Sequence, residues 1–120
     1  MEHISNILKR VFPMTETQLV KQILEFLQYK PGKFWRMNTG ATKFQSKGKD
    51  YFVRFGVPGQ ADITGIIDGK RIELEIKIPG GVQSDNQKQF QQMIEDNGGV
   101  YILAYSLDDV VNGLKKYWEL

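Results

Sequence analysis

Asp62, Glu75 and Lys77 are the residues whose types and spacing could do chemistry, because two carboxylates can hold a divalent cation beside an ammonium group that stabilises negative charge. Glu75 and Lys77 lie in RIELEIKIPGG, residues 71–81, where polar and apolar side chains alternate. Alternation predicts a strand with an apolar face (Leu74, Ile76 and Ile78) and an ionisable face (Glu73, Glu75 and Lys77). Solvated strand surfaces often carry the same ionisable residues, so this stretch alone leaves open whether the face is wet or is a site.

A predicted hairpin brings Asp62 to this strand. Asp68-Gly69 separates two apolar runs and is typical of a two-residue turn between antiparallel strands. In the register of such a turn, Asp62 lies opposite Glu75, with Cβ atoms roughly 5 Å apart. Carboxylates at that separation repel by about 1 kcal/mol in water and about 3 kcal/mol at the effective dielectric of a partly buried site. A divalent cation would offset this repulsion, so the register favours a metal site over a solvated surface.

The elements before the hairpin predict a helix and a first strand. A Thr-x-x-Gln capping box at Thr15–Gln18 begins a helix that ends before Pro31-Gly32. FWRMN, residues 34–38, predicts a strand, and residues 39–50 predict a glycine-bearing loop. YFVRFG, residues 51–56, predicts a second strand or an extension of the first.

The elements after the hairpin predict a parallel addition to the sheet. Ser84 and Gln87 form a second capping box, and the helix they begin ends at Gly98-Gly99, with Phe90, Met93 and Ile94 facing inward. VYILAY, residues 100–105, predicts a buried strand, parallel to the 70–78 strand because a helical connection makes a right-handed crossover. A last helix follows Ser106, with Val110, Val111, Leu114 and Trp118 on its inner face.

We therefore expect one α/β domain with a mixed sheet flanked by helices. Residues 1–14 form an N-terminal arm, residues 15–106 the core and residues 107–120 the C-terminal helix. The arm contains Ile4, Ile7, Leu8 and Val11 at helical spacing, before Pro13 interrupts it.

The composition excludes several kinds of site and location. The 120 residues include no cysteine, so no thiolate can act as nucleophile or ligand. The single histidine is His3, so a metal would be bound by oxygen ligands, which favours magnesium, manganese or calcium. The apolar runs are too short to cross a bilayer, and the N-terminus lacks the apolar stretch of a signal peptide. These features predict a soluble, cytoplasmic protein with no membrane partner.

Positive charge gathers between residues 33 and 54, although the net charge of the whole chain is only +2. Asp50 is the single acid in that stretch. Clustered lysines and arginines beside a metal favour nucleic acid as the partner, and such contacts position a duplex without reading its sequence. The residues predicted to contact phosphates are Arg36, Asn38, Lys43, Lys47, Lys49 and Arg54.

Asp62 followed by Glu75-Ile76-Lys77 matches the D, then (D/E)-x-K, signature of the PD-(D/E)xK nuclease superfamily. The surrounding stretches are more specific: RMNTG at 36–40, RFGVPGQAD at 54–62, QKQF at 87–90 and NGGVYILAYS at 97–106. Together they make residues 15–106 resemble the VRR-NUC family. Ala61 stands where that family has a proline, a departure that concerns backbone shape and not chemistry.

The resemblance implies a single VRR-NUC domain with an αβββαβ restriction-endonuclease-like core and a nuclease activity similar to that of Holliday junction resolvases. It implies that Asp62, Glu75 and the backbone carbonyl of Ile76 hold Mg²⁺ or Mn²⁺. Lys77 would orient the attacking water or stabilise charge on the phosphate, and its alternative role is a salt bridge to Glu75. A homodimer acting on branched DNA is implied as well, with a phage or bacterial source and the bacterial cytoplasm as its location.

Three further residues each have two candidate roles. Glu16 begins the first helix, where it could complete the metal shell or simply interact with the helix dipole. Gln87 could belong to the active site or only to its capping box. Glu73 lies on the ionisable face but outside the signature, so solvation or support of the site is expected. The candidate catalytic residues are therefore Asp62, Glu75, Lys77, Glu16 and Gln87.

Two classes of function fit this sequence. One is a metal-dependent, structure-selective DNA endonuclease that cuts junctions, flaps or single strands. The other is a nucleic-acid-binding module of the same fold that is non-catalytic or needs a partner, and an RNA nuclease is a further alternative. The intact Asp62, Glu75 and Lys77 favour the enzyme, because a binding module has no need of opposed acids.

Overall fold

Three helices and six strands make up the part of the chain that the computed structural model describes, residues 13–37 and 40–119, with only the backbone of residues 40–44 and 53–55. In chain order they are α2 (Glu16–Leu27), β1 (Lys33–Arg36), β2 (Gly40–Ser46), β3 (Lys49–Phe55), β4 (Ile63–Ile67), β5 (Lys70–Ile76), α3 (Asp85–Asp96), β6 (Val100–Ala104) and α4 (Leu107–Trp118). The expected mixed α/β architecture is confirmed. Nearly all of the expected N-terminal arm lies outside the described residues.

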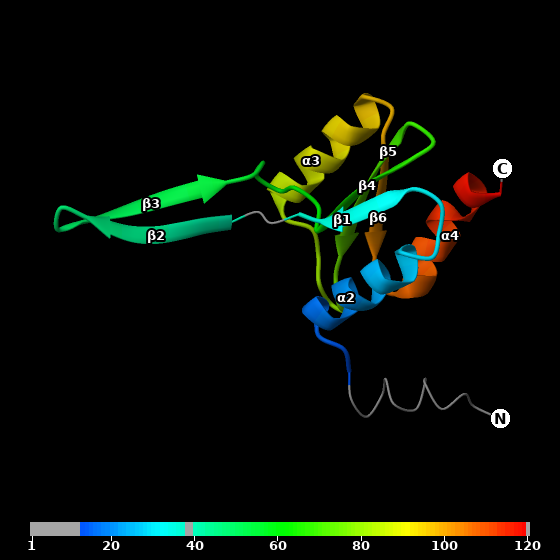
Figure 1. The fold of residues 1–120 in the computed structure, drawn as a ribbon, viewed down its shortest axis with the longest axis horizontal. Coiled ribbons are helices and arrows are strands. Elements are labelled where there is room, and N and C mark those ends of the chain that lie inside the picture. The colour runs from blue at the N-terminus through cyan, green and yellow to red at the C-terminus, as the bar shows by residue number, and fades with distance from the viewer. Residues whose placement is uncertain (1–12, 38–39, 120) are drawn as a thin grey trace.

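Four strands form the central sheet in the order β1-β4-β5-β6 (Figure 1). β4 pairs antiparallel with both β1 and β5, and β6 pairs parallel with β5. The predicted hairpin turn is confirmed: Ile67 pairs with Lys70, and Asp68 and Gly69 both have positive φ, 49° and 79°. The crossover through α3 is also confirmed, because it returns the chain parallel to β5.

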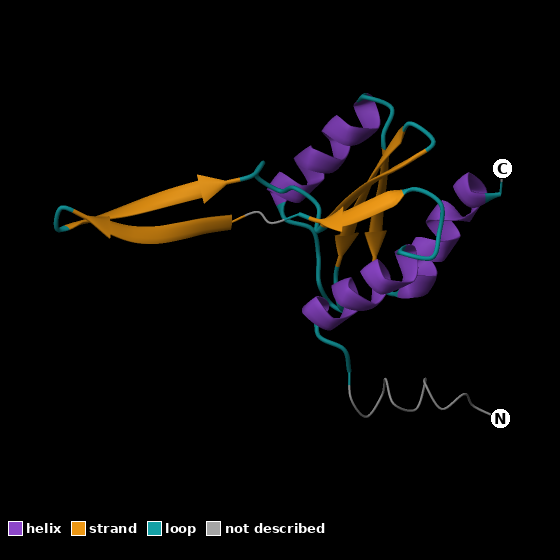
Figure 2. Ribbon diagram, in the orientation of Figure 1, coloured by secondary structure: helices purple, strands orange, loops and turns teal. Residues whose placement is uncertain are grey.

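The two faces of this sheet are covered by different helices (Figure 2). On the apolar face, Ile63, Ile72 and Leu74 pack in one buried cluster with α2 and α4. On the ionisable face, Phe90 and Ile94 of α3 form a smaller cluster with Ala61 and Tyr101. Both predicted capping boxes are present, at Thr15–Gln18 of α2 and at Ser84–Gln87 of α3.

The stretch expected to be a loop, residues 39–50, is largely a hairpin instead. β2 and β3 pair antiparallel through a tight turn at Lys47-Gly48, where φ is 53° and 75°. Neither strand joins the central sheet, and Figure 1 shows the hairpin projecting from the body of the molecule. The prediction was wrong because β2, GATKFQS, lacks the apolar alternation of a strand that packs on a core. Hydrogen bonds to β3 hold β2 in place, whereas burial of apolar side chains helps to hold the strands of the central sheet.

Three smaller expectations about burial were also wrong. Ile78 is exposed because β5 ends at Ile76 and the chain leaves the sheet. Met93 is exposed because the buried side of α3 consists of Phe90 and Ile94 alone. β6 is only half-buried over most of its length, since it forms the edge of the sheet.

None of the helices in the described ranges has the length and apolar character needed to cross a membrane.

Candidate active site

Asp62 and Glu75 meet where β4 begins and β5 ends. The β4–β5 ladder extends to Ile63 opposite Leu74, and the next step places Asp62 beside Glu75 as expected. Oδ2 of Asp62 accepts a hydrogen bond from the backbone N–H of Ile76 at 2.8 Å, and its backbone carbonyl accepts one from Met37 at 2.8 Å. Main-chain bonds on both sides therefore fix the position of the Asp62 carboxylate.

The loop before Asp62 packs against the start of α3, and Gly59 makes that contact feasible. Gly59 has a φ of +75°, and a Cβ built there would lie 2.2 Å from the carbonyl oxygen of Asn86. Glycine is the residue that tolerates both the conformation and the close approach. Ala61, which stands where the resemblance expects proline, is buried against Phe90 and Ile94. The loop is thus held to α3 on one side and delivers Asp62 to β4 on the other.

Glu75 is almost fully buried, with 2% of its surface exposed. Its Oε1 accepts a hydrogen bond from Nε2 of Gln87 at 3.0 Å and lies 3.8 Å from Nζ of Lys77. Its Oε2 is buried and accepts no hydrogen bond from an N–H or O–H group of the described residues, while a side-chain hydrogen bond with Asp62 contributes to the raised pKa of Glu75. The two carboxyl groups therefore interact directly, and a proton or a cation is needed between them.

The electrostatics of Glu75 are those of an anion without enough positive charge nearby. Its pKa is raised from 4.5 to about 8, first by burial and then by the negative charge of Asp62, while Lys77 acts in the opposite direction. The charge of Glu16 adds a smaller rise to the pKa of Glu75. One lysine thus does not neutralise this pair of acids.

These residues fit a hard divalent cation. A buried carboxylate oxygen that no described N–H or O–H group contacts, next to a second carboxylate, is the donor set that Mg²⁺ and Mn²⁺ prefer. Within the described ranges, no group of three or more acidic or histidine side chains converges on one point, so Asp62 and Glu75 would be the side-chain ligands. Mg²⁺ commonly keeps several waters and uses one or two carboxylates, which suits such a set. The backbone carbonyl of Ile76 stays a predicted ligand.

Gln87 forms the capping box and also contacts Glu75, while its part in an active site stays a prediction. Its Oε1 accepts a hydrogen bond from the backbone N–H of Ser84 at 2.8 Å, which completes the capping box. Its Nε2 donates to Glu75 at the same time. The side chain that begins α3 therefore also orients the candidate metal ligand. Glu16 lies exposed in the first turn of α2, so its part in a metal shell stays a prediction.

Of the two roles expected for Glu73, solvation is wrong, and support of the site stays a prediction. Glu73 is fully buried, and its Oε1 accepts hydrogen bonds from Oγ1 of Thr64 and Nε of Arg71, both at 2.7 Å. α3 and the loop at residues 57–61 cover this part of the ionisable face. Since Glu73 and Glu75 are both buried, the face is not an ordinary wet strand surface.

The predicted phosphate-contacting residues are dispersed around the site. Lys47 and Lys49 are exposed at the tip of the β2–β3 hairpin, which projects from the body of the molecule (Figure 1). Arg36 is exposed at the end of β1. Lys43 and Arg54 lie on β2 and β3, where the backbone alone is described, and Asn38 lies outside the described residues. Lys47 and Lys49 therefore lie at the far end of the hairpin, whereas Arg36 pairs with Ile63, the residue that follows Asp62.

Arg71, Trp35 and Tyr101 share the ionisable face and were not among the predicted site residues. The i, i+2 spacing of Arg71 and Glu73 on one strand was the available signal for their ion pair. Tyr101 pairs with Glu73 across the sheet, and burial raises the pKa of its phenol to about 12 while a hydrogen bond from Gln83 opposes that rise. Tyr101 is therefore a neutral hydroxyl near the acids.

Comparison of the chain with protein-family models, curated proteins and solved structures finds no match.

Proposed function

We propose that this protein is a metal-dependent nuclease that hydrolyses phosphodiester bonds in DNA and selects its substrate by structure. The observation that carries this proposal is the buried acid pair itself: Oε2 of Glu75 accepts no hydrogen bond from an N–H or O–H group of the described residues, and the carboxyl lies directly against that of Asp62. An acid pair of this kind destabilises a fold unless a proton or a cation neutralises part of its charge. When bound, Mg²⁺ or Mn²⁺ neutralises the scissile phosphate and lowers the pKa of a coordinated water.

The protein side chains have distinct roles in this proposal. Asp62 and Glu75 hold the cation, and the hydrogen bonds from Ile76 and Gln87 keep their carboxylates in place. Lys77 is mostly buried, with 15% of its side chain exposed, and its Nζ is directed at the acid pair. A positive charge at that position can orient a water or stabilise charge that develops on the phosphate. The salt bridge to Glu75 holds Lys77 ready for this role, so the two functions proposed for it are compatible.

The order of elements supports a restriction-endonuclease-like core. Without the β2–β3 hairpin, the described chain runs helix, three antiparallel strands, helix, parallel strand, which is the αβββαβ order expected from the resemblance to VRR-NUC domains. In the proposed core, β2 and β3 are an insertion between the first and second strands. Asp62 then lies directly before the second core strand and Glu75 lies on the third, an arrangement that fits the D, then (D/E)-x-K, signature.

Branched DNA is the proposed substrate, with a homodimer as the active form. Lys47 and Lys49 at the tip of a projecting hairpin can contact phosphates at a distance from the cut, which favours substrates with more than one duplex arm. Two symmetry-related sites would cut the two strands that a four-way junction presents. Resolution of such junctions is therefore the proposed activity.

Cleavage of a labelled four-way DNA junction tests the proposal. The junction is incubated beside linear duplex, single strand and RNA of matched sequence, with Mg²⁺, Mn²⁺ or EDTA. Lys77→Ala removes the proposed catalytic ammonium, and Lys70→Ala, which removes an exposed lysine from the start of the same strand, is the matched control. We expect metal-dependent, symmetric nicks with the wild type and with Lys70→Ala, and none with Lys77→Ala.

Two results would count against the proposal. Junction binding without cleavage in either metal would indicate a non-catalytic or partner-dependent binding module. Preferential cleavage of the RNA substrate would replace DNA with RNA as the proposed substrate.

A further inference from the structure

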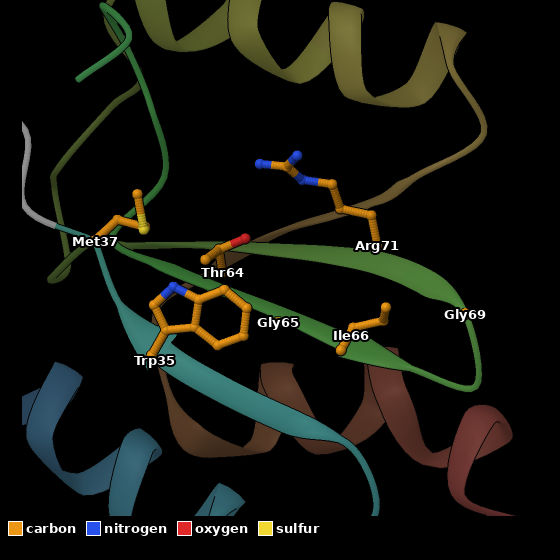
Figure 3. A pocket seen from close by; sticks show the side chains of 7 residues that line it. All are labelled: Trp35, Met37, Thr64, Gly65, Ile66, Gly69 and Arg71. Atoms are coloured by element: carbon orange, nitrogen blue, oxygen red, sulfur yellow. The ribbon is translucent and has the colours of Figure 1, made fainter.

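A hollow of about 320 Å³ lies on the ionisable face of the sheet, beyond the edge of α3 (Figure 3). Trp35, Met37, Ile66 and Arg71 line it, with Thr64 and Gly65 at its floor. Trp35 and Ile66 are 47% and 45% exposed, so two large apolar side chains face solvent on neighbouring strands. A hollow with apolar walls and a few polar groups has the form that ligand sites commonly take.

Arg71 borders this hollow and is held there by a buried acid. Its Nε donates to Oε1 of Glu73 at 2.7 Å, and the same oxygen accepts the hydroxyl of Thr64. The Glu73 side chain is fully buried, whereas 58% of the Arg71 side chain is exposed. One edge of the guanidinium is thus fixed to the sheet, and the remaining N–H groups are directed to solvent beside the hollow. A buried carboxylate that orients an exposed arginine is the arrangement expected for recognition of an anion or a polar ring.

Trp35 supplies a flat apolar surface next to this cation. Figure 3 shows the indole rising from β1 on one side of Thr64, with the guanidinium of Arg71 extending toward Thr64 from β5 on the other side. Trp35 pairs with Thr64, and Thr64 pairs with Glu73, so all three side chains lie on one face of the sheet. Lys33, which pairs with Ile66, belongs to the same face and is exposed. The hollow therefore combines an aromatic surface with the positive charge of Arg71, and Lys33 adds a second charge on the same face outside its lining.

The hollow lies along the strand that begins at the candidate metal ligand. Thr64 and Ile66 follow Asp62 by two and four residues, or about 7 and 13 Å at the rise of a strand. Stacked nucleotides advance by about 3.4 Å each, so a strand cut at the acid pair passes the hollow within a few nucleotides. The site and the hollow can thus contact the same strand.

We propose that this hollow binds an unpaired nucleotide of the DNA strand, with the base against Trp35 and the phosphate or base edge on Arg71. Aromatic side chains bind unpaired bases by stacking without regard to sequence, and paired bases in a duplex are not accessible to them. The inference deepens the proposed nuclease function, on which its choice of ligand rests. It defines the substrate class as DNA with unpaired nucleotides next to the cut, such as the exchange point of a junction or the base of a flap.

Fluorescence of Trp35 tests the proposal in EDTA, where the acid pair cannot act. The chain has two tryptophans, so Trp118→Phe leaves Trp35 as the single reporter. We expect a saturable change in its fluorescence on addition of an oligothymidylate of twelve nucleotides. A blunt duplex or thymidine monophosphate, at equal nucleotide concentration, should cause a much smaller change.

Substitutions in the full-length chain supply the second readout. Trp35→Ala should weaken oligothymidylate binding about thirtyfold, the middle of the range for loss of one stacked base. Trp35→Phe should retain most of the affinity because it retains a ring, and Arg71→Gln should weaken binding. Tyr29→Ala removes an aromatic side chain that is more exposed than Trp35, 89% against 47%, from the turn after α2, and should leave the affinity unchanged.

The outcomes separate this inference from the nuclease proposal. If the wild type cleaves DNA but Trp35 does not respond and Trp35→Ala keeps full affinity, the nucleotide site is refuted and the nuclease stands. If Trp35 responds and its removal weakens binding, yet neither metal supports cleavage, the nucleotide site stands and the nuclease is refuted. If Trp35→Ala alters the molecular mass in solution and not the affinity, the hollow is an interface between copies and the inference is overturned.

Discussion

Glu75→Gln in the metal-free protein is the perturbation whose effect the structure defines best. Glu75 is buried beside Asp62, with Glu16 adding further negative charge and Lys77 as the opposing cation. Its folded-state pKa of about 8 lies above its unfolded value near 4.5, so the folded protein keeps a proton there that the unfolded chain releases. The contribution of Glu75 to the free energy of unfolding is therefore largest below about pH 4.5 and is lost as the pH rises through about 8.

The magnitude follows from the pKa difference. Each pKa unit corresponds to about 1.4 kcal/mol, so a rise from 4.5 to about 8 sets an upper bound of about 5 kcal/mol on the stability lost between pH 4 and pH 9. Glutamine has no charge to bury, and its amide oxygen can still accept the hydrogen bond from Gln87. Glu75→Gln should therefore be several kcal/mol more stable than the wild type at pH 8.5, and nearly equal to it at pH 4.5.

Urea unfolding at pH 4.5, 7 and 8.5, in EDTA and in Mg²⁺, measures this effect. Subtracting the free energy of unfolding of the wild type from that of Glu75→Gln at each pH removes the contribution of the groups that titrate in both proteins. Mg²⁺ should restore wild-type stability at pH 8.5, by about 2.7 kcal/mol at one hundred times its dissociation constant, and should not stabilise Glu75→Gln. A wild type whose free energy of unfolding is the same at pH 4.5 and 8.5, with no gain from Glu75→Gln, would show that the acid pair is not under strain.

Three further predictions concern the supports of the site. Ser84→Ala removes only the cap of α3, so it should lower the free energy of unfolding by about 1 kcal/mol and leave cleavage unchanged. Gln87→Ala also removes the hydrogen bond to Glu75, so it should reduce the rate of cleavage as well. Unfolding curves and initial cleavage rates measure the two effects. Gly59→Ala should destabilise the protein by more than the 1–3 kcal/mol or so of backbone strain alone, because its Cβ would collide with α3; the unfolding midpoint would check this, and a change below about 1 kcal/mol would contradict it. Replacing Lys47 and Lys49 with alanine should weaken binding equally for all DNA sequences and reduce the salt dependence of log K by about 0.9 for each phosphate that the variant no longer neutralises, measured by titration at several salt concentrations.

Local signals in the sequence were sufficient for much of the fold. The Asp68-Gly69 turn specifies its own register, and the register alone placed Asp62 beside Glu75. Capping boxes likewise mark helix starts through contacts between residues three apart, which is why both were predicted correctly. Features of this kind depend on neighbours in the chain and not on the tertiary structure.

Burial could not be predicted in the same way. The ionisable face of β5 has the composition of a wet surface, and it is buried because α3 and the Gly59 loop pack over it from distant parts of the sequence. The β2–β3 hairpin was missed for the opposite reason, since its strands pair without a core and so lack an apolar pattern. Exposure of Ile78 likewise depends on where β5 leaves the sheet.

The charges at the site explain why burial and catalysis belong together in the proposed function. Asp62, Glu75 and Lys77 carry a net charge of −1 when both acids are ionised, and a negative site repels a phosphodiester. A divalent cation changes that sum to +1, which attracts the phosphate and at the same time removes the penalty on Glu75. Because α3 excludes water from one side of Glu75 and donates Gln87 to it, the helix both raises the pKa of that acid and orients it. The same packing that destabilises the metal-free pair therefore strengthens its interaction with a cation, since electrostatic attraction increases as water is excluded.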